Sequence, residues 1–401
     1  MGMNDVVSAD RLHIGFFGCR NAGKSSLVNA VTAQHLSVVS DTAGTTTDPV
    51  KKSMELLPIG PVVIVDTPGF DDTGALGAQR VARTAQVLQT IDVAVLVVDG
   101  TIGAAQTDRE LLKLFEQRKL PYLIAWNKSD AGTPSVELAG VPLQRQVWVS
   151  AKTGQGIHEL KETIGALAKD HAKQPPLIAD KLETGDLVVL VVPIDSAAPK
   201  GRLILPQQQT IRDILDADAR ALVVKENELA HTLEELRMPP ALVITDSQVF
   251  GKVMNIVPRE IKLTSFSILM ARRKGFLAMA VSGAAKLDCL QDGDRVLICE
   301  GCTHHRQCGD IGTEKLPKWL QTYTGRNLQL TFASGKDFSE HLTDYALVIH
   351  CGGCMLTERE VRSRMEQAVS AGVPVTNYGT AIAQMNGILE RSLEIFPELY
   401  L

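Results

Sequence analysis

The chain has 401 residues, of which 45% are hydrophobic and 22% charged, and its formal net charge is −5 with a pI near 6.0. This acidic balance argues against a general nucleic-acid binder, because such proteins usually carry a basic excess that replaces phosphate counterions. No apolar run approaches the roughly 20 residues of a membrane span, and the first residues lack the pattern of an export signal. We therefore expect a cytoplasmic protein of two or three domains, with no membrane and no nucleic-acid partner.

From about residue 11 to residue 170, apolar strands alternate with helical segments. The strands are LHIGFFG, VVIVD, VAVLVVDG, YLIAWNK and VWVS, and the helices are KSSLVNAVTAQ, ELLKLFEQRK and IHELKETIGALAKD. Continuously apolar strands that alternate with helices predict a parallel, doubly wound sheet covered on both faces. Pro175 and Pro176 then break the pattern and indicate a linker. The first domain is therefore predicted over residues 8–172.

A phosphate-binding loop follows the first strand. The segment GCRNAGKSS has Gly18, Gly23, Lys24 and Ser25 in the G-x-x-x-x-G-K-[ST] register, directly before a helix. Backbone N–H groups and the positive end of the helix bind phosphate in such a loop. We expect Lys24 to reach the β- and γ-phosphates and Ser25 to bind Mg²⁺. The nucleotide-binding residues predicted in this loop are Asn21, Ala22, Gly23, Lys24, Ser25 and Ser26.

Two downstream segments have the character of switches. VVIVDTPGF places Asp66 at a strand end, where it can hold a Mg²⁺ water, and Gly69 where its N–H can sense the γ-phosphate. The polar segment SDTAGTTTDP suits a mobile switch in which Thr46 closes on Mg²⁺ and the γ-phosphate. The predicted catalytic residues are thus Lys24, Thr46, Asp66 and Gly69.

Two later segments predict that the base is guanine. IAWNKSD follows a strand, and its Asn127, Lys128 and Asp130 have the spacing of a guanine-reading element. The Asp130 carboxylate can accept from N1 and the exocyclic amine of guanine, and adenine has no such donor pair on that edge. VSAKTG supplies the loop that closes over the base, with Ser150, Ala151 and Lys152. Each segment alone has an ordinary structural explanation, but such coincidences in this order are improbable.

This first block resembles small GTPases of the TrmE and Era kind, which share NAGKSSLVNA, here Asn21 to Ala30, and a GTT switch, here Gly44 to Thr46. In that group an asparagine equivalent to Asn21 helps to bind K⁺, which supplies positive charge where an arginine finger would otherwise act. Phe70 stands where Ras-like enzymes carry a water-orienting glutamine. The resemblance therefore implies slow intrinsic GTP hydrolysis that K⁺ stimulates.

Two further α/β blocks are predicted after the linker. Residues 178–262 alternate short strands and helices without clustered His, Cys or carboxylate residues, which indicates a small α/β unit for packing or self-association. Residues 263–401 form another doubly wound block. Near the start of this last block lies the basic run Arg272, Arg273 and Lys274, which is interpreted as a solvated helix end.

The cysteines gather in the last block. Six of the seven fall after residue 288, and two groups, LICEGCTHHRQCG and LVIHCGGC, each follow a predicted strand. The carboxyl ends of neighbouring parallel strands converge, so Cys302, Cys351 and Cys354 can share one site. A redox pair, a zinc site that recruits a histidine, and an iron–sulfur cluster with an exchangeable fourth position all stay open, with spacing favouring the cluster over zinc. His304 and His350 are candidates for the fourth ligand. Cys299 is expected in the core, and Cys289 and Cys19 as small apolar fillers.

Taken together, the three blocks closely resemble the FeFe-hydrogenase maturation GTPase family, HydF. The most specific match is Cys302-Thr303-His304 with His350-Cys351-Gly352-Gly353-Cys354. The resemblance implies a P-loop GTPase domain, a small α/β dimerisation domain and a Rossmann-like α/β domain whose Cys302, Cys351 and Cys354 hold a 4Fe-4S cluster. It also implies a homodimer that carries a transient di-iron precursor, works with two radical-SAM maturases and delivers its cargo to apo FeFe-hydrogenase. GTP would act as a switch on partner exchange.

Two other functions are compatible with the motifs. A TrmE-like GTPase could act in RNA modification, although the acidic balance and the unexplained late cysteines weigh against it. A GTPase regulated by zinc or by thiol oxidation would use the same cysteines as a sensor.

Overall fold

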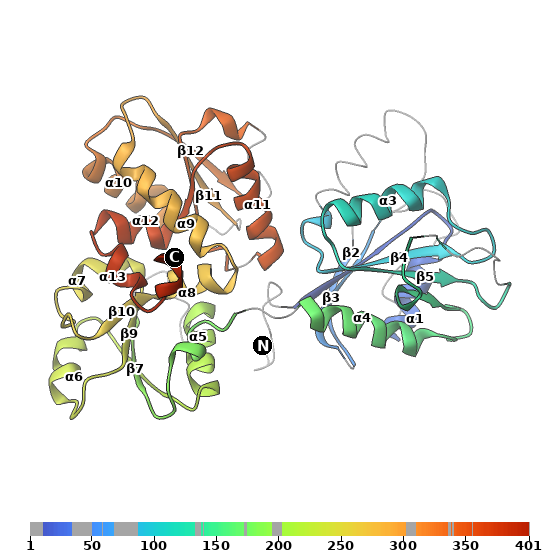
Figure 1. The fold of residues 1–401 in the computed structure, drawn as a ribbon, viewed down its shortest axis with the longest axis horizontal. Coiled ribbons are helices and arrows are strands. Elements are labelled where there is room, and N and C mark those ends of the chain that lie inside the picture. Colours follow the sequence, from blue (N-terminus) through green and yellow to red (C-terminus); the bar gives the residue numbers. More distant parts are fainter. Residues whose placement is uncertain are drawn as a thin grey trace. The chain divides into compact units, whose positions relative to one another are not determined.

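The computed structural model describes residues 11–33, 50–57, 59–67, 87–132, 138, 140–171, 175–194, 203–301, 310–335, 338, 341–354 and 356–400. The chain divides into two compact units, residues 1–173 and 174–401. Each unit is α/β, as the sequence predicts (Figure 1). None of the helices in the described ranges is long and apolar enough to span a membrane.

The first unit is built on one six-stranded sheet. Its strands are β1 (Leu12–Phe17), β2 (Val50–Leu56), β3 (Gly60–Asp66), β4 (Val93–Asp99), β5 (Tyr122–Asn127) and β6 (Gln146–Trp148). Its described α-helices are α1 (Lys24–Thr32), α3 (Gln106–Gln117) and α4 (Ile157–His171). The strand order is β2-β3-β1-β4-β5-β6. Strand β1 pairs in parallel with β3 and β4, which puts the residues that follow β1, β3 and β5 at one edge of the sheet.

Alternate residues of these strands fill two separate hydrophobic cores. Ile14 and Phe16 of β1 pack into the core that α1 and α4 cover, whereas Phe17 packs into the core that α3 covers. Figure 1 shows α3 on one face of the sheet and α1 with α4 on the other. Burial of both faces is why these strands are continuously apolar, and the predicted doubly wound sheet is confirmed.

Strand β2 departs from the prediction of a parallel sheet. It forms the edge of the sheet and pairs antiparallel with β3, from Val50 opposite Asp66 to Leu56 opposite Gly60. Among its residues 51–56, which read KKSMEL, most are exposed and Leu56 is the buried one. An edge strand that faces solvent does not need apolar residues on both faces, so its sequence carries no strong strand pattern.

The second unit contains two four-stranded parallel sheets. The first is formed by β7 (Leu187–Val191), β8 (Arg220–Val224), β9 (Leu242–Thr245) and β10 (Lys262–Ser265), in the order β10-β9-β7-β8. The second is formed by β11 (Arg295–Glu300), β12 (Gln329–Ser334), β13 (Leu347–His350) and β14 (Val375–Asn377), in the order β12-β11-β13-β14. The described α-helices are α5 (Leu205–Asp216), α6 (Leu229–Glu235), α7 (Phe250–Val253), α8 (Phe266–Arg273), α9 (Leu277–Ala284), α10 (Leu316–Thr324), α11 (Glu358–Ser370), α12 (Tyr378–Met385) and α13 (Leu389–Leu393).

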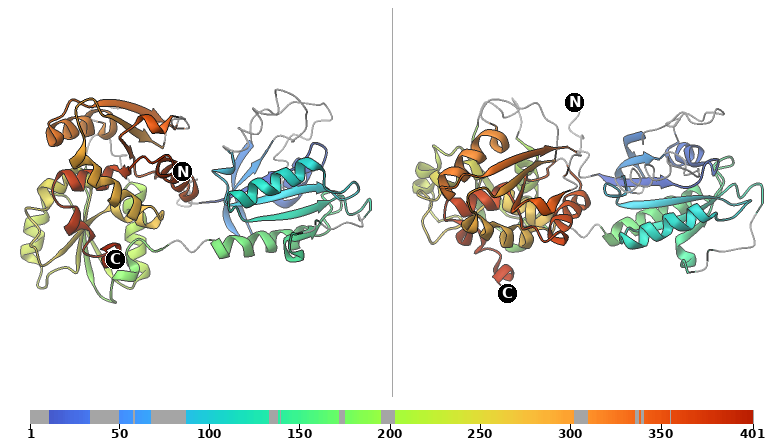
Figure 2. Two further views of the ribbon diagram at one scale, coloured as in Figure 1. Left: turned by 45° about the horizontal axis from the view of Figure 1, so that its top comes forward. Right: turned by 90° about the horizontal axis from the view of Figure 1, so that it is seen from above.

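One hydrophobic core runs through both sheets of the second unit. It includes Val189 of β7, Leu269 of α8 and Ile298 of β11, all of which are buried. In both views of Figure 2 the green-to-red second unit is a layered body of strands and helices. Strand β10 crosses the boundary expected between residues 262 and 263 and pairs with β9. The domain limits 8–172, 178–262 and 263–401 stay a prediction.

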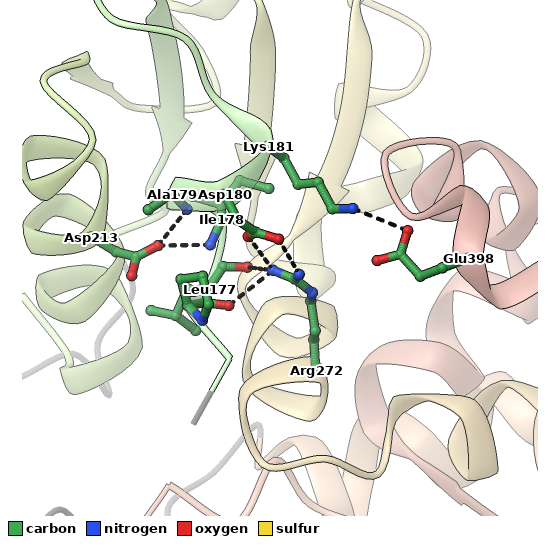
Figure 3. A network of polar contacts seen from close by, with 9 residues as sticks. Leu177, Ile178, Ala179, Asp180, Lys181, Asp213, Arg272 and Glu398 are labelled. Carbon is green, nitrogen blue, oxygen red and sulfur yellow. Dashed lines mark hydrogen bonds and ion pairs between the residues drawn. The ribbon is translucent and has the colours of Figure 1, made fainter. Parts of the chain in front are cut away.

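The basic run at the end of α8 is not a solvated helix end, so that interpretation is wrong for two of its three residues. The guanidinium of Arg272 donates to both carboxylate oxygens of Asp180, at 2.7 and 2.6 Å, and its side chain is only 14% exposed (Figure 3). It also donates to the carbonyls of Pro176 and Leu177, at 2.9 and 3.1 Å. Lys274 is 5% exposed.

The start of the second unit is held by further contacts around Arg272. Asp213 of α5 accepts from the backbone N–H groups of Ile178 and Ala179, at 2.7 and 2.8 Å (Figure 3). Lys181 forms an ion pair with Glu398 at 3.0 Å. The contacts of Asp213 fix the first residues of the unit, because they satisfy backbone N–H groups that would otherwise lack a partner.

Candidate functional site

The predicted phosphate loop lies between β1 and α1, and two glycines shape it. Gly18 has φ +139°, and a Cβ there would stand 2.1 Å from the Val97 carbonyl oxygen. Gly23 has φ +84°, and a Cβ there would stand 2.3 Å from Nδ2 of Asn127. Both positions thus require glycine for conformation and for space. The loop can approach β4 and the base-reading strand β5 only because these side chains are missing.

Lys24 begins α1 and folds its side chain over the loop. Its ammonium group donates to the carbonyls of Gly18 and Cys19, at 3.0 and 2.8 Å, and the residue is 7% exposed. These contacts place a buried positive charge at the N-terminus of α1, where the helix dipole also favours an anion. This arrangement can bind phosphate.

Ser25 and Asp66 meet at the neighbouring strand end. The Ser25 hydroxyl donates to Oδ2 of Asp66 at 2.9 Å. The other carboxylate oxygen, Oδ1, is buried and has no hydrogen-bond partner among the described residues. A buried carboxylate oxygen without a donor is costly, and a Mg²⁺ ion or one of its waters would satisfy it. The pair therefore fits the predicted magnesium site.

Asn127 connects the end of β5 to both loops around it. Its Nδ2 donates to the carbonyl of Ala22 at 2.9 Å, and its Oδ1 accepts from the N–H of Ala151 at 3.1 Å. The side chain is 2% exposed. Asn127 thus holds the phosphate loop and the loop of Ser150, Ala151 and Lys152 together, which fits its predicted place at the base site.

Asp130 is exposed, and it stands next to Ser150. The Ser150 hydroxyl donates to Oδ1 of Asp130 at 2.7 Å, and this hydrogen bond holds the pKa of the carboxyl below its usual value. The carboxylate is therefore ionised at neutral pH, as two N–H donors of guanine require. Lys128 has φ +65°, and its ammonium group forms an ion pair with the Asp99 carboxylate at 2.6 Å.

A glycine substitution tests the close packing of this site. Gly23→Ala is expected to displace Asn127 and weaken GTP binding by about tenfold or more, since the hydrogen bonds of Asn127 contribute about 1 kcal/mol each. Gly60→Ala is the matched control, because Gly60 has φ +100° but a Cβ there would meet nothing within 4 Å. Both variants carry similar backbone strain. Equal GTP affinities of the two variants, measured by titration, would contradict the expectation.

The described residues do not cover the whole predicted site. Thr46 and Gly69 lie outside them, and so do Phe70, Cys302 and His304. Asn21, Ser26 and Lys152 lie within the described residues, and Asn21 is exposed with φ +61°. The binding and catalytic roles of all these residues stay predictions.

The second predicted site lies at the carboxyl edge of the sheet β12-β11-β13-β14. Strands β11 and β13 are parallel neighbours, with Cys299 opposite His350. The N–H of Cys351 donates to the carbonyl of Cys299 at 2.8 Å. Gly301, two residues beyond Cys299, lies next to the CGGC loop, which comprises residues 351–354.

The sulfur of Cys351 accepts two backbone hydrogen bonds. Gly301 N donates to Sγ at 3.1 Å and Gly353 N at 3.4 Å. Burial raises the pKa of the Cys351 thiol, and these two donors act in the opposite direction. N–H groups that point at a sulfur stabilise the thiolate, which is the form that binds metal.

His350 is fully buried, and both of its ring nitrogens have partners. Burial lowers its pKa to about 4, so the imidazole is neutral at pH 7. Nδ1 lies 2.8 Å from the carbonyl of Cys351, which can only accept, so we assign the proton to Nδ1. Nε2 then accepts from Arg364 at 3.4 Å. In this conformation His350 orients the loop and has no nitrogen available to a metal.

Two buried donors near this edge are unsatisfied. Nδ2 of Asn377, opposite His350 in β14, and Oη of Tyr378 have no hydrogen-bond partner among the described residues. Burial, and then the proximity of Cys351 and Glu300, raises the pKa of Tyr378 above its usual range. Such donors suit a bound group that accepts hydrogen bonds.

Three further cysteines lie within the described residues, namely Cys19, Cys289 and Cys299. Cys299 is 1% exposed, as expected for a core residue, and burial raises its pKa to about 12. Cys289 is exposed, so its interpretation as an apolar filler is wrong. Cys19 is half-buried, and its thiol donates to Asp108 at 3.4 Å. The residues in the described ranges form no cluster of three metal-binding side chains.

Lys274 was not predicted as a site residue, yet it contacts the CGGC loop. Its ammonium donates to the carbonyl of Gly353 and, at 2.8 Å, to that of Leu356. In the sequence it is the last residue of the basic run Arg272, Arg273 and Lys274, which carries no sign of a contact with this loop. Its carbonyl partners carry no residue-specific pattern, so no motif could have identified it.

Three family models match the chain. The 50S ribosome-binding GTPase model matches residues 13–128, the Hydrogen maturase F dimerization domain model residues 177–275, and the Hydrogen maturase F tetramerization domain model residues 278–395. With the loop and base-reading geometry above, they define a P-loop GTPase domain followed by two further α/β sheets. The chain belongs to the hydrogen maturase F family of FeFe-hydrogenase maturation GTPases, as the sequence resemblance indicates.

Curated relatives match the GTPase part. GTPase Der of Wolinella succinogenes is 34% identical over 180 residues, which are 41% of this chain and 37% of that protein. The tRNA modification GTPase MnmE of Nitrosomonas europaea is 33% identical over 148 residues, 37% of this chain and 32% of that protein. This chain thus spans about a third of the length of these relatives.

Solved structures resemble the chain only weakly. A probable GTP-binding protein engB shares 23% identity over 39% of this chain and 99% of its own, with a TM-score of 0.30. Era of Aquifex aeolicus, bound to GDP and aluminium fluoride, shares 18% identity over 81% of this chain and 94% of its own, with a TM-score of 0.33. Likeness at this level carries no weight for function.

Proposed function

We propose that the protein is a GTP-hydrolysing scaffold that holds a 4Fe-4S cluster at Cys302, Cys351 and Cys354 and delivers a di-iron precursor to apo FeFe-hydrogenase. The observation that carries the proposal is the 3.1 Å hydrogen bond from the N–H of Gly301 to the sulfur of Cys351. Cys302 follows Gly301 directly in the sequence. This neighbourhood supports the proposal that two sequence-distant cysteine groups share one site.

The donor set suits an iron–sulfur cluster with one open position. Thiolate sulfur is the preferred ligand of iron in such clusters, and N–H groups already point at one of the sulfurs. With three thiolates, the fourth position is left to His304 or to an outside molecule, since both nitrogens of His350 have partners. When bound, the cluster would supply an iron atom at which cargo can exchange. Asn377 and Tyr378 offer unsatisfied donors to such cargo.

The GTPase domain would control the timing of exchange. Lys24 and the loop N–H groups bind the phosphates, Ser25 and Asp66 hold Mg²⁺ together with Thr46, and Gly69 senses the γ-phosphate. Asp130 selects guanine. The two maturase-family matches favour self-association, and we propose a homodimer that exchanges cargo with two radical-SAM maturases.

Anaerobic reconstitution with iron and sulfide tests the cluster. We expect the reduced wild-type protein to give the EPR signal of a 4Fe-4S cluster and Cys302→Ser to lose most of it, because a serine oxygen is a poor ligand for iron in place of thiolate. A colourless wild-type protein that retains stoichiometric zinc would sink the scaffold in favour of a zinc-sensing GTPase. Activity on tRNA would favour RNA modification instead.

Potassium dependence tests the role of Asn21. We expect GTP turnover at least about tenfold faster in K⁺ than in Na⁺, because a bound cation would stabilise charge that develops on the phosphates. Asn21→Gly is expected to abolish the difference. Glycine tolerates the φ of +61° at this position, so this variant removes only the side chain. Equal wild-type turnover in the two salts would show that K⁺ has no such role.

A further inference from the structure

The end of α8 contacts two segments that are far apart in sequence. Arg272, its second-to-last residue, holds the carbonyls of Pro176 and Leu177 and the carboxylate of Asp180 (Figure 3). Lys274, directly after the helix, holds the carbonyls of Gly353 and Leu356. The first segment is the entry of the chain into the second unit from the GTPase unit. The second segment is the CGGC loop with the turn that follows it.

We propose that Lys274 is a positioning residue for the CGGC loop, and that Arg272 and Lys274 make the end of α8 a single support that couples this loop to the entry segment 176–181. The proposal rests on the scaffold function argued above. It assigns to the second unit's own residues a link between the CGGC loop and the segment that follows the linker.

The contacts of Lys274 are of the kind that fix a loop. An ammonium group that is 5% exposed would be costly to bury without acceptors, so the Gly353 and Leu356 carbonyls stabilise it and it stabilises them. Gly353 has φ +61°, and a Cβ there would stand 2.6 Å from Cγ2 of Val361, so the loop has little freedom to move toward α11. Lys274 therefore holds the carbonyl side of this turn. The N–H of Gly353 in the same turn donates to the sulfur of Cys351.

The contacts of Arg272 are equally well placed for coupling. Its guanidinium is held by a two-oxygen ion pair with Asp180 and lies 4.9 Å from the ring centre of Phe396. A guanidinium group that binds a carboxylate with two hydrogen bonds and also lies over an aromatic ring has few alternative positions. The Arg272 side chain is therefore restricted to few rotamers. Only Arg273 separates Arg272 from Lys274, so a displacement of segment 176–181 must move or strain the support of the CGGC loop.

Hydrogen exchange of the cluster-free protein tests the positioning role. Lys274→Met is expected to speed exchange of the amides of residues 352–356 by at least about tenfold, the effect of losing hydrogen bonds to a charged group. Lys274→Arg, which keeps the charge, is expected to restore part of the protection. Lys262→Met removes an exposed lysine from the same unit and serves as the matched control, with no change expected in this loop. Unchanged exchange in Lys274→Met would overturn the proposal, and Lys274→Gln replaces it should the methionine variant not fold.

Coupling needs a second variant and a second readout. Arg272→Lys loses the fork to Asp180 but keeps the charge, and we expect faster exchange both in residues 177–181 and in residues 352–356. A change confined to residues 177–181 would overturn the coupling. In reconstituted protein, Lys274→Met but not Lys262→Met is expected to shift the cluster midpoint potential to more negative values, because a nearby positive charge is lost. A wild-type protein that takes up no iron would defeat the scaffold function alone, since the exchange experiment needs no cluster.

Discussion

Asp130→Asn is expected to lower GTP affinity by a factor of about 100 to 1,000. The carboxylate would accept hydrogen bonds from two guanine donors, and hydrogen bonds to an ionised group are roughly twice as strong as those between neutral groups. An asparagine side chain keeps one acceptor oxygen but replaces the other with an NH₂ group. That NH₂ group would face the exocyclic amine of guanine, and two donors cannot form a hydrogen bond with each other. The Ser150 hydroxyl, which donates to Asp130 at 2.7 Å, can still donate to the asparagine oxygen. The loop should therefore keep its shape.

The measurement is nucleotide titration with GTP, ATP and XTP. Xanthine carries a carbonyl where guanine has its amine, so the variant is expected to prefer XTP over GTP while the wild type prefers GTP. Asp216→Asn removes an exposed carboxylate from the second unit and should change neither affinity. A variant that binds GTP as tightly as the wild type does would show that Asp130 does not read the base.

Cys351→Ser is expected to abolish the cluster while leaving the protein folded. Its sulfur is a proposed iron ligand and also the acceptor of the Gly301 and Gly353 N–H groups. A serine oxygen can still accept those two hydrogen bonds, so the unfolding temperature of the cluster-free protein should change little. The same oxygen is a weak partner for iron in a cluster. Iron and sulfide bound per chain should therefore fall at least about fivefold.

Cys289→Ser is the control, because Cys289 is an exposed free cysteine outside the CGGC loop. It should retain the full iron and sulfide content and the EPR signal of the wild type. Iron loss in both variants would indicate nonspecific binding by thiols. Full retention of iron in Cys351→Ser would remove this residue from the ligand set.

The sequence was sufficient to place residues at the ends of neighbouring strands. Asp66 and Asn127 end apolar strands, and parallel pairing brings strand ends together. The same logic predicted that β11 and β13 are neighbours, which is confirmed, whereas the role of Cys302 stays a prediction. Strand β2 could not be found in this way, because an exposed edge strand lacks the apolar pattern.

Lys274 and Arg272 were misjudged for a related reason. Their acceptors are mostly backbone carbonyls 79 to 96 residues away, and every residue type carries such a group. A run of three basic residues is usually solvated, so the sequence alone led to the wrong interpretation of a solvated helix end. Only the tertiary structure distinguishes a lysine that reaches a loop from one that reaches water. His350 is a similar case, since spacing made it a candidate ligand and did not show that Arg364 meets its Nε2.

The single hydrophobic core of the second unit links the stability of the cysteine loop to residues far from it. Since buried residues of both sheets pack into that core, the stretches that match the two maturase-family models should melt in one cooperative transition. A cut between them would expose apolar surface on both fragments and invite aggregation. A mutation that weakens the β7–β10 sheet would then raise the rate at which the cysteine loop opens to oxygen and proteases. Tolerance to air would thus depend partly on residues that never approach a sulfur.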